Sequence, residues 1–253
     1  IYRVVPADKP ARKPTRLDTL DTAALVAALD SPNGTQRDMA EAVRWYGRAA
    51  DKGHAGARAT LATLLELGDG VPKDLVKAIE LYQQAAEAGD AAGMTSLGYL
   101  YEQGKGVGQD AAKAAALYLR AAAAGDPRAA YNLAGMLREG RGVAADPAQA
   151  AKLYRQAADN GFAAAKRGLA VLYDEGSGVP RDPKAAARLV LEAYRAGHKE
   201  TREELARQPE AWSEATRREI QSTLRRDGFF KGRADGRFGP PTWTALQAWA
   251  KRK

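Results

Sequence analysis

The chain has 253 residues and no cysteine, which excludes disulfides, thiolate metal sites and thiol nucleophiles. It contains no run of about 18 apolar residues, so no transmembrane helix is predicted. The net charge of +8 comes from the two ends, because residues 1–16 carry a net +4 and residues 213–253 a net +6. Basic ends favour an anionic partner or surface, although solubility alone also explains them.

The N-terminal segment, residues 1–16, places three prolines at four-residue steps among lysines and arginines. This pattern disfavours a helix and predicts an extended, basic tether. The chain begins at Ile1 and no apolar signal segment follows, so we interpret it as a fragment or a processed form. Attachment to a membrane is therefore expected only through a segment upstream. A short helix is predicted over Ala23–Leu29 and a longer one over about Arg37–Lys52.

A 36-residue period then dominates the sequence. The stretch from Asp90 to Gly125 recurs, and a fixed period of this length predicts a solenoid. We assign residues 17–208 to this solenoid, with terminal half-units around four full repeats: 54–89, 90–125, 126–161 and 162–197. The recurring positions include Tyr46, Tyr82, Tyr118 and Tyr154; Gly53, Gly89, Gly125, Gly161 and Gly197; and the pairs Gly68/Gly70, Gly104/Gly106, Gly140/Gly142 and Gly176/Gly178.

Each repeat is predicted to form two helices. The first is expected to end at the Gly-x-Gly pair, where glycine reaches positive φ without a Cβ clash. An aspartate four residues later is placed to cap the second helix. That helix carries Ala-x-x-x-Tyr-x-x-Ala-Ala, whose small residues allow close helix packing.

These motifs resemble a known family. The residues that carry the resemblance are Leu97-Gly98, Tyr101, Gly104-Lys105-Gly106-Val107, Asp110, Ala114, Leu117-Tyr118, Ala121-Ala122 and Gly125. They resemble the Sel1-like repeat, a relative of the tetratricopeptide repeat. The resemblance implies an all-α fold, a right-handed α-solenoid of helix pairs. It also implies an adaptor scaffold that holds proteins together, of a kind that is often periplasmic or secreted in bacteria.

Residues 209–253 follow a different pattern. A helix is predicted from Ser213 or Thr216 to about Arg226, then a glycine-rich loop, then a last helix from Thr242 to about Lys251. We expect Phe229 and Phe238 to fill a small core. The motif G-F-x-x-G-x-x-D-G-x-F-G-x-x-T resembles the peptidoglycan-binding domain at the ends of cell-wall hydrolases. That family usually continues into a third helix, so here the module is abbreviated or borrows a helix from the solenoid.

Two sets of candidate binding residues follow. By resemblance to tetratricopeptide repeats, the concave face of the first helices is expected to bind a protein partner, and tyrosine and arginine are enriched at such surfaces. The candidates there are Tyr99, Tyr131, Arg138 and Arg167. For peptidoglycan, whose stem carboxylates suit arginine, the candidates are Arg233, Asp235, Gly236, Arg237 and Trp243. Asp235 and Gly236 also have an expected structural role in the loop. The column Glu66, Glu102 and Asp174 is interpreted as a solvated groove edge.

No catalytic constellation, metal site or cofactor motif is predicted. The two histidines, His54 and His198, occupy one column four repeats apart, and we expect both to be exposed and without function. The Gly-x-Gly-Val loops lack a preceding strand and a Gly-Lys-Ser/Thr sequence, so they do not resemble phosphate loops.

The favoured hypothesis is a non-enzymatic periplasmic scaffold, which binds a protein partner through the solenoid and peptidoglycan through the C-terminal module. The chain resembles the periplasmic part of alphaproteobacterial polar organelle development proteins, which implies a role in polar localisation or envelope organisation. One alternative is the regulatory or targeting tail of a larger enzyme, such as a caspase-like protease or wall hydrolase. A nucleic-acid-binding basic end is a further alternative, but no recognition pattern supports it.

Overall fold

The structure, a computed structural model, describes residues 36–252, with side chains from residue 42 onward. The predicted tether over residues 1–16 and the predicted helix Ala23–Leu29 lie outside the described residues. Helices and turns make up the described part, which contains no strand. None of the described helices is long and apolar enough to cross a membrane.

The chain forms two compact units, Ile1–Ala88 and Gly89–Lys253. In the first unit, α3 packs against both α2 and α4. These helices span α2 Gln36–Asp51, α3 Ala55–Leu67 and α4 Leu75–Glu87.

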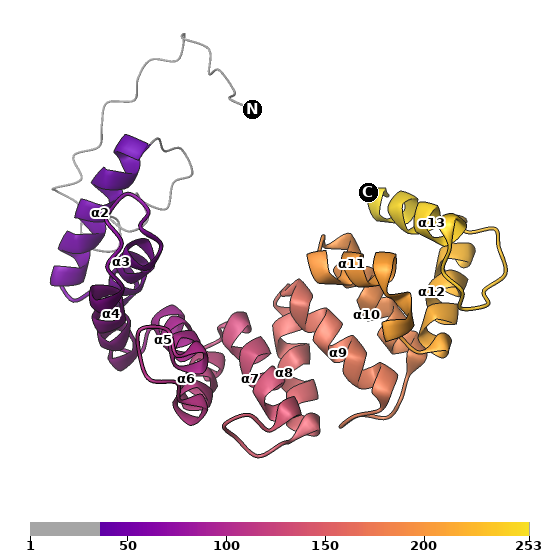
Figure 1. The fold of residues 1–253 in the computed structure, drawn as a ribbon, viewed down its shortest axis with the longest axis horizontal. Helices are drawn as coiled ribbons and strands as arrows, with labels where there is room; N and C mark the ends of the chain where they lie inside the picture. Colours follow the sequence, from indigo (N-terminus) through magenta and orange to yellow (C-terminus); the bar gives the residue numbers. More distant parts are fainter. Residues whose placement is uncertain (1–35, 253) are drawn as a thin grey trace, which may run out of the picture. The chain divides into compact units, whose positions relative to one another are not determined.

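The second unit contains three helix pairs in tandem, in which each helix packs on its neighbours in sequence (Figure 1). The pairs are α5 Ala91–Gln103 with α6 Ala111–Ala123, α7 Pro127–Glu139 with α8 Pro147–Asp159, and α9 Ala163–Glu175 with α10 Pro183–Arg195. Beyond them lie α11 Lys199–Arg207, the short 3-10 helix η2 Pro209–Ala211, α12 Glu214–Arg226 and α13 Pro240–Lys251. The all-α solenoid prediction is confirmed.

The capping pattern explains why the helices begin and end where they do. Gly104 ends α5 with φ +67° and donates its amide to the carbonyl of Leu100. Asp110 then begins α6, because its carboxylate accepts a 2.9 Å hydrogen bond from the amide of Lys113. Three other aspartates cap second helices in the same way: Asp74, Asp146 and Asp182.

The recurring tyrosine fills the space between the paired helices. Tyr118 in α6 is fully buried, as are Ala114 and Ala121 on the same helix. Gly98 in α5 faces this ring so closely that a Cβ there would lie 2.9 Å from Cε1 of Tyr118. A larger residue at position 98 would therefore push the two helices apart.

The C-terminal helices are built on the last repeat. Both α12 and α13 contact α10, and α12 makes the larger contact (Figure 1). The fully buried side chains of Ile220 and Leu224 come from α12, while Leu246 and Trp249 come from α13. A helix of the solenoid thus contributes to the core of the C-terminal module.

Neither phenylalanine predicted to fill the core of this module is fully buried. Phe230, rather than Phe229, is buried, and Phe229 and Phe238 are only half-buried. The reason is the irregular loop, in which both amides of the Phe229-Phe230 pair turn back to the carbonyl of Leu224. This turn directs the second ring, not the first, into the core.

Candidate binding surfaces

The first helices contact one another through a regular column of side chains. Each member contacts the next first helix or its N-terminal cap, although the chemistry differs. The hydroxyl of Thr95 in α5 donates to the carboxylate of Asp126, which caps α7, at 2.7 Å. The ring of Tyr131 in α7 packs edge-on against Phe162, which precedes α9, at 5.3 Å between centroids.

The third member of the column is Arg167 in α9, which forms an ion pair with Glu204 in α11. Its Nε donates to Glu204 at 2.9 Å, and this hydrogen bond raises the pKa of Arg167. Burial raises the pKa of Tyr131. Both Tyr131 and Arg167 are therefore engaged in contacts between repeats, and partner binding by them stays a prediction.

The other two solenoid candidates are more accessible. Tyr99 in α5 is 47% exposed. Arg138 in α7 donates to Glu139 at 2.6 Å. Burial opposes the charge of Arg138, but the bond to Glu139 and the nearby negative charges together raise the pKa of Arg138. Of the four candidates, Tyr99 offers the largest free surface to a partner.

The acidic column predicted to edge a solvated groove is instead structural, and the prediction is wrong. Glu66 and Glu102 each accept a hydrogen bond from the tyrosine hydroxyl sixteen residues later, at 3.0 Å from Tyr82 and 2.9 Å from Tyr118. These carboxylates accept hydrogen bonds from the hydroxyl groups of buried tyrosine rings, because a buried polar group without a partner destabilises the fold.

At the last repeat, the acidic residue of this column, Asp174, bonds to a different partner. The position equivalent to Tyr118 is Val190, which has no hydroxyl to offer. Asp174, only 8% exposed, instead accepts hydrogen bonds from the amide of Ser213 at 2.8 Å and the hydroxyl of Thr216 at 2.6 Å. The Ser213 hydroxyl also donates to it. Asp174 thereby joins the solenoid to the N-terminus of α12.

The C-terminal module contains a cavity of about 510 Å³ beside the glycine-rich loop. Four of the five predicted peptidoglycan candidates contribute to it, namely Arg233, Asp235, Gly236 and Arg237. The α12 side of the cavity is formed by Glu214, Arg217 and Arg218, which the sequence analysis did not single out. Trp243 does not line this cavity.

The loop is held by specific hydrogen bonds. The buried Gln221 in α12 accepts the amide of Gly236 at 2.7 Å and donates to the carbonyl of Arg237 at 2.8 Å. The Asp235 carboxylate accepts the amide of Arg237 at 2.9 Å, and this bond lowers the pKa of Asp235. Asp235 therefore bonds the loop backbone and is ionised at neutral pH.

The four arginines of the cavity differ in their pairing. Arg218 pairs with Glu214 at 2.5 Å, and Arg217 lies 3.9 Å from Glu210. The guanidinium groups of Arg233 and Arg237 are exposed and form no hydrogen bond or ion pair within residues 36–252. Two free guanidinium groups over a cavity with further arginines suit a carboxylate ligand.

The repeats match a known protein family. The model of the Sel1 repeat matches residues 27–54, 57–90, 91–126, 127–162 and 163–198, well over half of the chain. The chain belongs to the Sel1 repeat family. The first match, 27–54, covers the region where the sequence analysis placed a terminal half-unit.

Solved Sel1 repeat structures are similar along most of the chain. A Sel1 repeat protein from Oxalobacter formigenes has 27% identity and a TM-score of 0.68, covering 91% of this chain and 86% of that one. A protective antigen of uropathogenic Escherichia coli with an SLR fold has 22% identity and a TM-score of 0.63, covering 90% and 51%. An immunity protein of Pseudomonas aeruginosa has 20% identity and a TM-score of 0.52, covering 96% and 82%. A search of curated proteins found no match.

The family assignment supports a general function. Sel1 repeat solenoids generally bind protein partners and act as scaffolds without catalysis of their own. Among residues 36–252, no group of three or more His, Asp or Glu side chains is arranged to hold a metal ion. The solenoid is thus consistent with a protein-interaction scaffold.

The two histidines have a structural role that the sequence analysis missed. Both are half-buried helix N-caps rather than exposed residues without a role. Nδ1 of His54 accepts the amide of Ala57 at 3.1 Å, and Nδ1 of His198 accepts the amide of Thr201 at 3.4 Å. Burial lowers the pKa of His198, which favours the neutral, accepting form. Their column contains Asp90 and Asp126, and these capping residues were the available signal.

Proposed function

We propose that this Sel1 repeat chain is a non-enzymatic scaffold of the bacterial periplasm that binds peptidoglycan through its C-terminal module and a protein partner through the face of the first helices. This function would serve localisation or organisation at the cell envelope. The periplasmic location follows from the proposed ligand, since the wall lies there.

One observation carries the wall-binding half of the proposal. Arg233 and Arg237 hold unpaired guanidinium groups at the mouth of a 510 Å³ cavity, on a loop fixed by Gln221. Cavities of about 300–1,000 Å³ are of the usual size for small ligands. The carboxylates of peptidoglycan stem peptides would pair with the two arginines as charge-assisted hydrogen bonds. The motif resemblance of residues 228–242 to peptidoglycan-binding domains points to the same ligand.

The protein-binding half is supported by the family and by the exposed Tyr99 in α5. A half-exposed aromatic side chain on a helical repeat can bury a large area against a partner at little entropic cost. The hydrogen bond from Thr95 to Asp126 holds α5, which carries Tyr99, to the start of α7.

Co-sedimentation of the full chain with purified sacculi tests the wall-binding half. We expect the wild-type chain to pellet, and the double variant Arg233→Ala/Arg237→Ala to bind at least about 10-fold more weakly, because two charged hydrogen bonds are each worth about 1.5–3 kcal/mol. Bound fraction against sacculus concentration gives the measurement.

The matched control is Arg225→Ala/Lys231→Ala, which removes the same charge from exposed positions that do not line this cavity. It is expected to pellet like the wild type. If both double variants lost the same share of sacculus binding, the interaction would be general electrostatic attraction. If the wild-type chain did not pellet, the proposal of wall binding would be wrong.

A further inference from the structure

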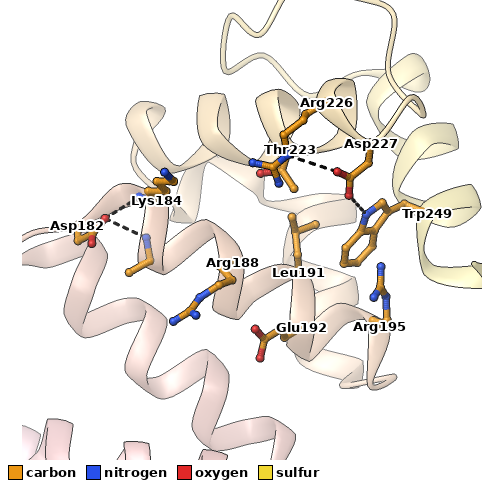
Figure 2. A pocket seen from close by; sticks show the side chains of 11 residues that line it. Asp182, Lys184, Arg188, Leu191, Glu192, Arg195, Thr223, Arg226, Asp227 and Trp249 are labelled. Atoms are coloured by element: carbon orange, nitrogen blue, oxygen red, sulfur yellow. Dashed lines mark hydrogen bonds and ion pairs between the residues drawn. The ribbon is translucent and has the colours of Figure 1, made fainter. Parts of the chain in front are cut away.

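A second cavity, of about 560 Å³, lies where the last repeat meets the C-terminal helices. Figure 2 shows its side chains coming from α10 on one side and from α12 and α13 on the other. It shares no lining residue with the arginine cavity beside the glycine-rich loop. Its volume falls within the range of about 300–1,000 Å³ that is usual for ligand sites.

Two apolar side chains lie at the inner side of this cavity, which we call the joint groove, and both are almost completely buried. Leu191 in α10 is 2% exposed and Trp249 in α13 is 6% exposed. The indole nitrogen of Trp249 donates to the carboxylate of Asp227 at 2.8 Å, so its one polar group is already satisfied. The guanidinium of Arg195 lies 3.6 Å from the ring centroid and covers one part of the ring (Figure 2). The groove therefore exposes little of these two side chains, and the ring of Trp249 already carries a stacked cation.

The acidic residues around the groove are all satisfied by the protein itself. Asp182 caps α10 by accepting the amides of Lys184 and Ala185. Glu192 pairs with Lys166 at 2.8 Å, and Asp227 accepts from Trp249.

Two cations, in contrast, have no such partner. The side chains of Lys184 and Arg188 in α10 are exposed, line the groove, and form no hydrogen bond or ion pair within the described part of the chain. They lie one helical turn apart on the same face, since residues four apart are neighbours on a helix. The unpaired charged side chains at the groove are thus both positive.

We propose that the joint groove binds an acidic peptide segment of a protein partner. The carboxylates of this segment would pair with Lys184 and Arg188, which line the cavity and are exposed. The complementarity of two free cations to carboxylates, beside a cavity of ligand size, favours such a segment.

A nucleic acid fits less well, because its backbone carries closely spaced negative charges. The carboxylates of Asp182, Glu192 and Asp227 are interspersed with the cations around the groove and would repel a continuous phosphate chain. A peptide can place its few charges opposite the cations alone. This inference goes beyond the proposed function, because it uses neither the first-helix face nor the arginine cavity.

Fluorescence anisotropy with the full chain tests the proposal. The probe is a short fluorescein-labelled peptide that alternates aspartate and leucine. We expect saturable binding that weakens at least about 10-fold in Lys184→Ala/Arg188→Ala, because the variant removes two charge-assisted hydrogen bonds to the peptide. The same weakening is expected when asparagine replaces aspartate in the probe. The control variant Arg225→Ala/Lys231→Ala should bind like the wild type.

Three results would overturn the proposal: no binding of the aspartate probe by the wild type, equal weakening in both double variants, or tighter Lys184- and Arg188-dependent binding of a single-stranded oligonucleotide. Pelleting of Lys184→Ala/Arg188→Ala with sacculi separates this test from wall binding. The variant should pellet like the wild type while losing the peptide.

Discussion

Replacing Gly178 with alanine should lower the free energy of unfolding by about 3 kcal/mol or more, the sum of left-handed strain and overpacking. Gly178 has φ +69°, and a Cβ there would lie 2.2 Å from the carbonyl carbon of Pro147 and 2.4 Å from its oxygen. Those atoms belong to the first turn of α8, so the clash is with backbone rather than with a flexible side chain. The loop after α9 must therefore move away from the preceding repeat.

Gly161→Ala is the matched control for this effect. Gly161 has φ +83° but nothing lies within 4 Å of its would-be Cβ, so only the strain of about 1–2 kcal/mol applies. Urea denaturation followed by circular dichroism measures both variants. Equal destabilisation would contradict the close packing of the loop on α8, because only Gly178 has backbone in its way.

Asp174→Ala should loosen the C-terminal module while leaving the repeats folded. The substitution leaves Ser213 and Thr216 without their shared acceptor at a buried site, which costs about 3 kcal/mol for a charged network. Amide hydrogen exchange in α12 and α13 should accelerate by about 100-fold, since each 1.4 kcal/mol is a factor of ten. Asp174→Asn should give a smaller acceleration, because its amide oxygen still accepts one bond.

The control for this prediction is Glu102→Ala, the same column in an interior repeat. Glu102 accepts from Tyr118 and pairs with Arg141, and neither partner belongs to α12 or α13. Exchange in the C-terminal helices should therefore stay at the wild-type rate. Unchanged protection of α12 in Asp174→Ala would show that apolar packing on α10 alone holds the module.

The period made the helices predictable, because glycine and aspartate recur at most of the helix ends. Gly104 and Asp110 act in the structure as their residue types suggest, one through positive φ and the other through a side-chain acceptor. Local chemistry decides these features, so one repeat is enough to predict them.

Features that depend on contacts between repeats were not predictable in this way. The role of Gly178 against α8 requires the stacking of neighbouring loops, and the pairing of Glu102 with Tyr118 requires the fold of a whole repeat. The column at Asp174 was misread as solvated for the same reason. Asp174 bonds to α12 because Val190, unlike the tyrosines of the other repeats, has no hydroxyl to donate. The sequence shows this valine, but only the packing of α12 shows what replaces the hydroxyl.

The binding surfaces also include one part that the sequence predicts and one part that only the fold shows. Arg233 and Arg237 could be chosen from a motif on one loop. Arg217 and Arg218, which complete that cavity, lie on the preceding helix and required the three-dimensional arrangement. The joint groove could not be predicted, because Leu191 and Trp249 are far apart in sequence and each resembles an ordinary core residue.

A three-component pelleting experiment tests most directly whether this chain is a scaffold with separate binding surfaces. Sacculi, the full chain and the labelled aspartate–leucine peptide are mixed, and the peptide in the pellet is measured. The peptide should pellet only when the wild-type chain is present. It should be lost with Lys184→Ala/Arg188→Ala although that chain still pellets, and lost together with the chain in Arg233→Ala/Arg237→Ala. A peptide that binds the chain in solution but stays in the supernatant when the wild-type chain pellets would contradict the account.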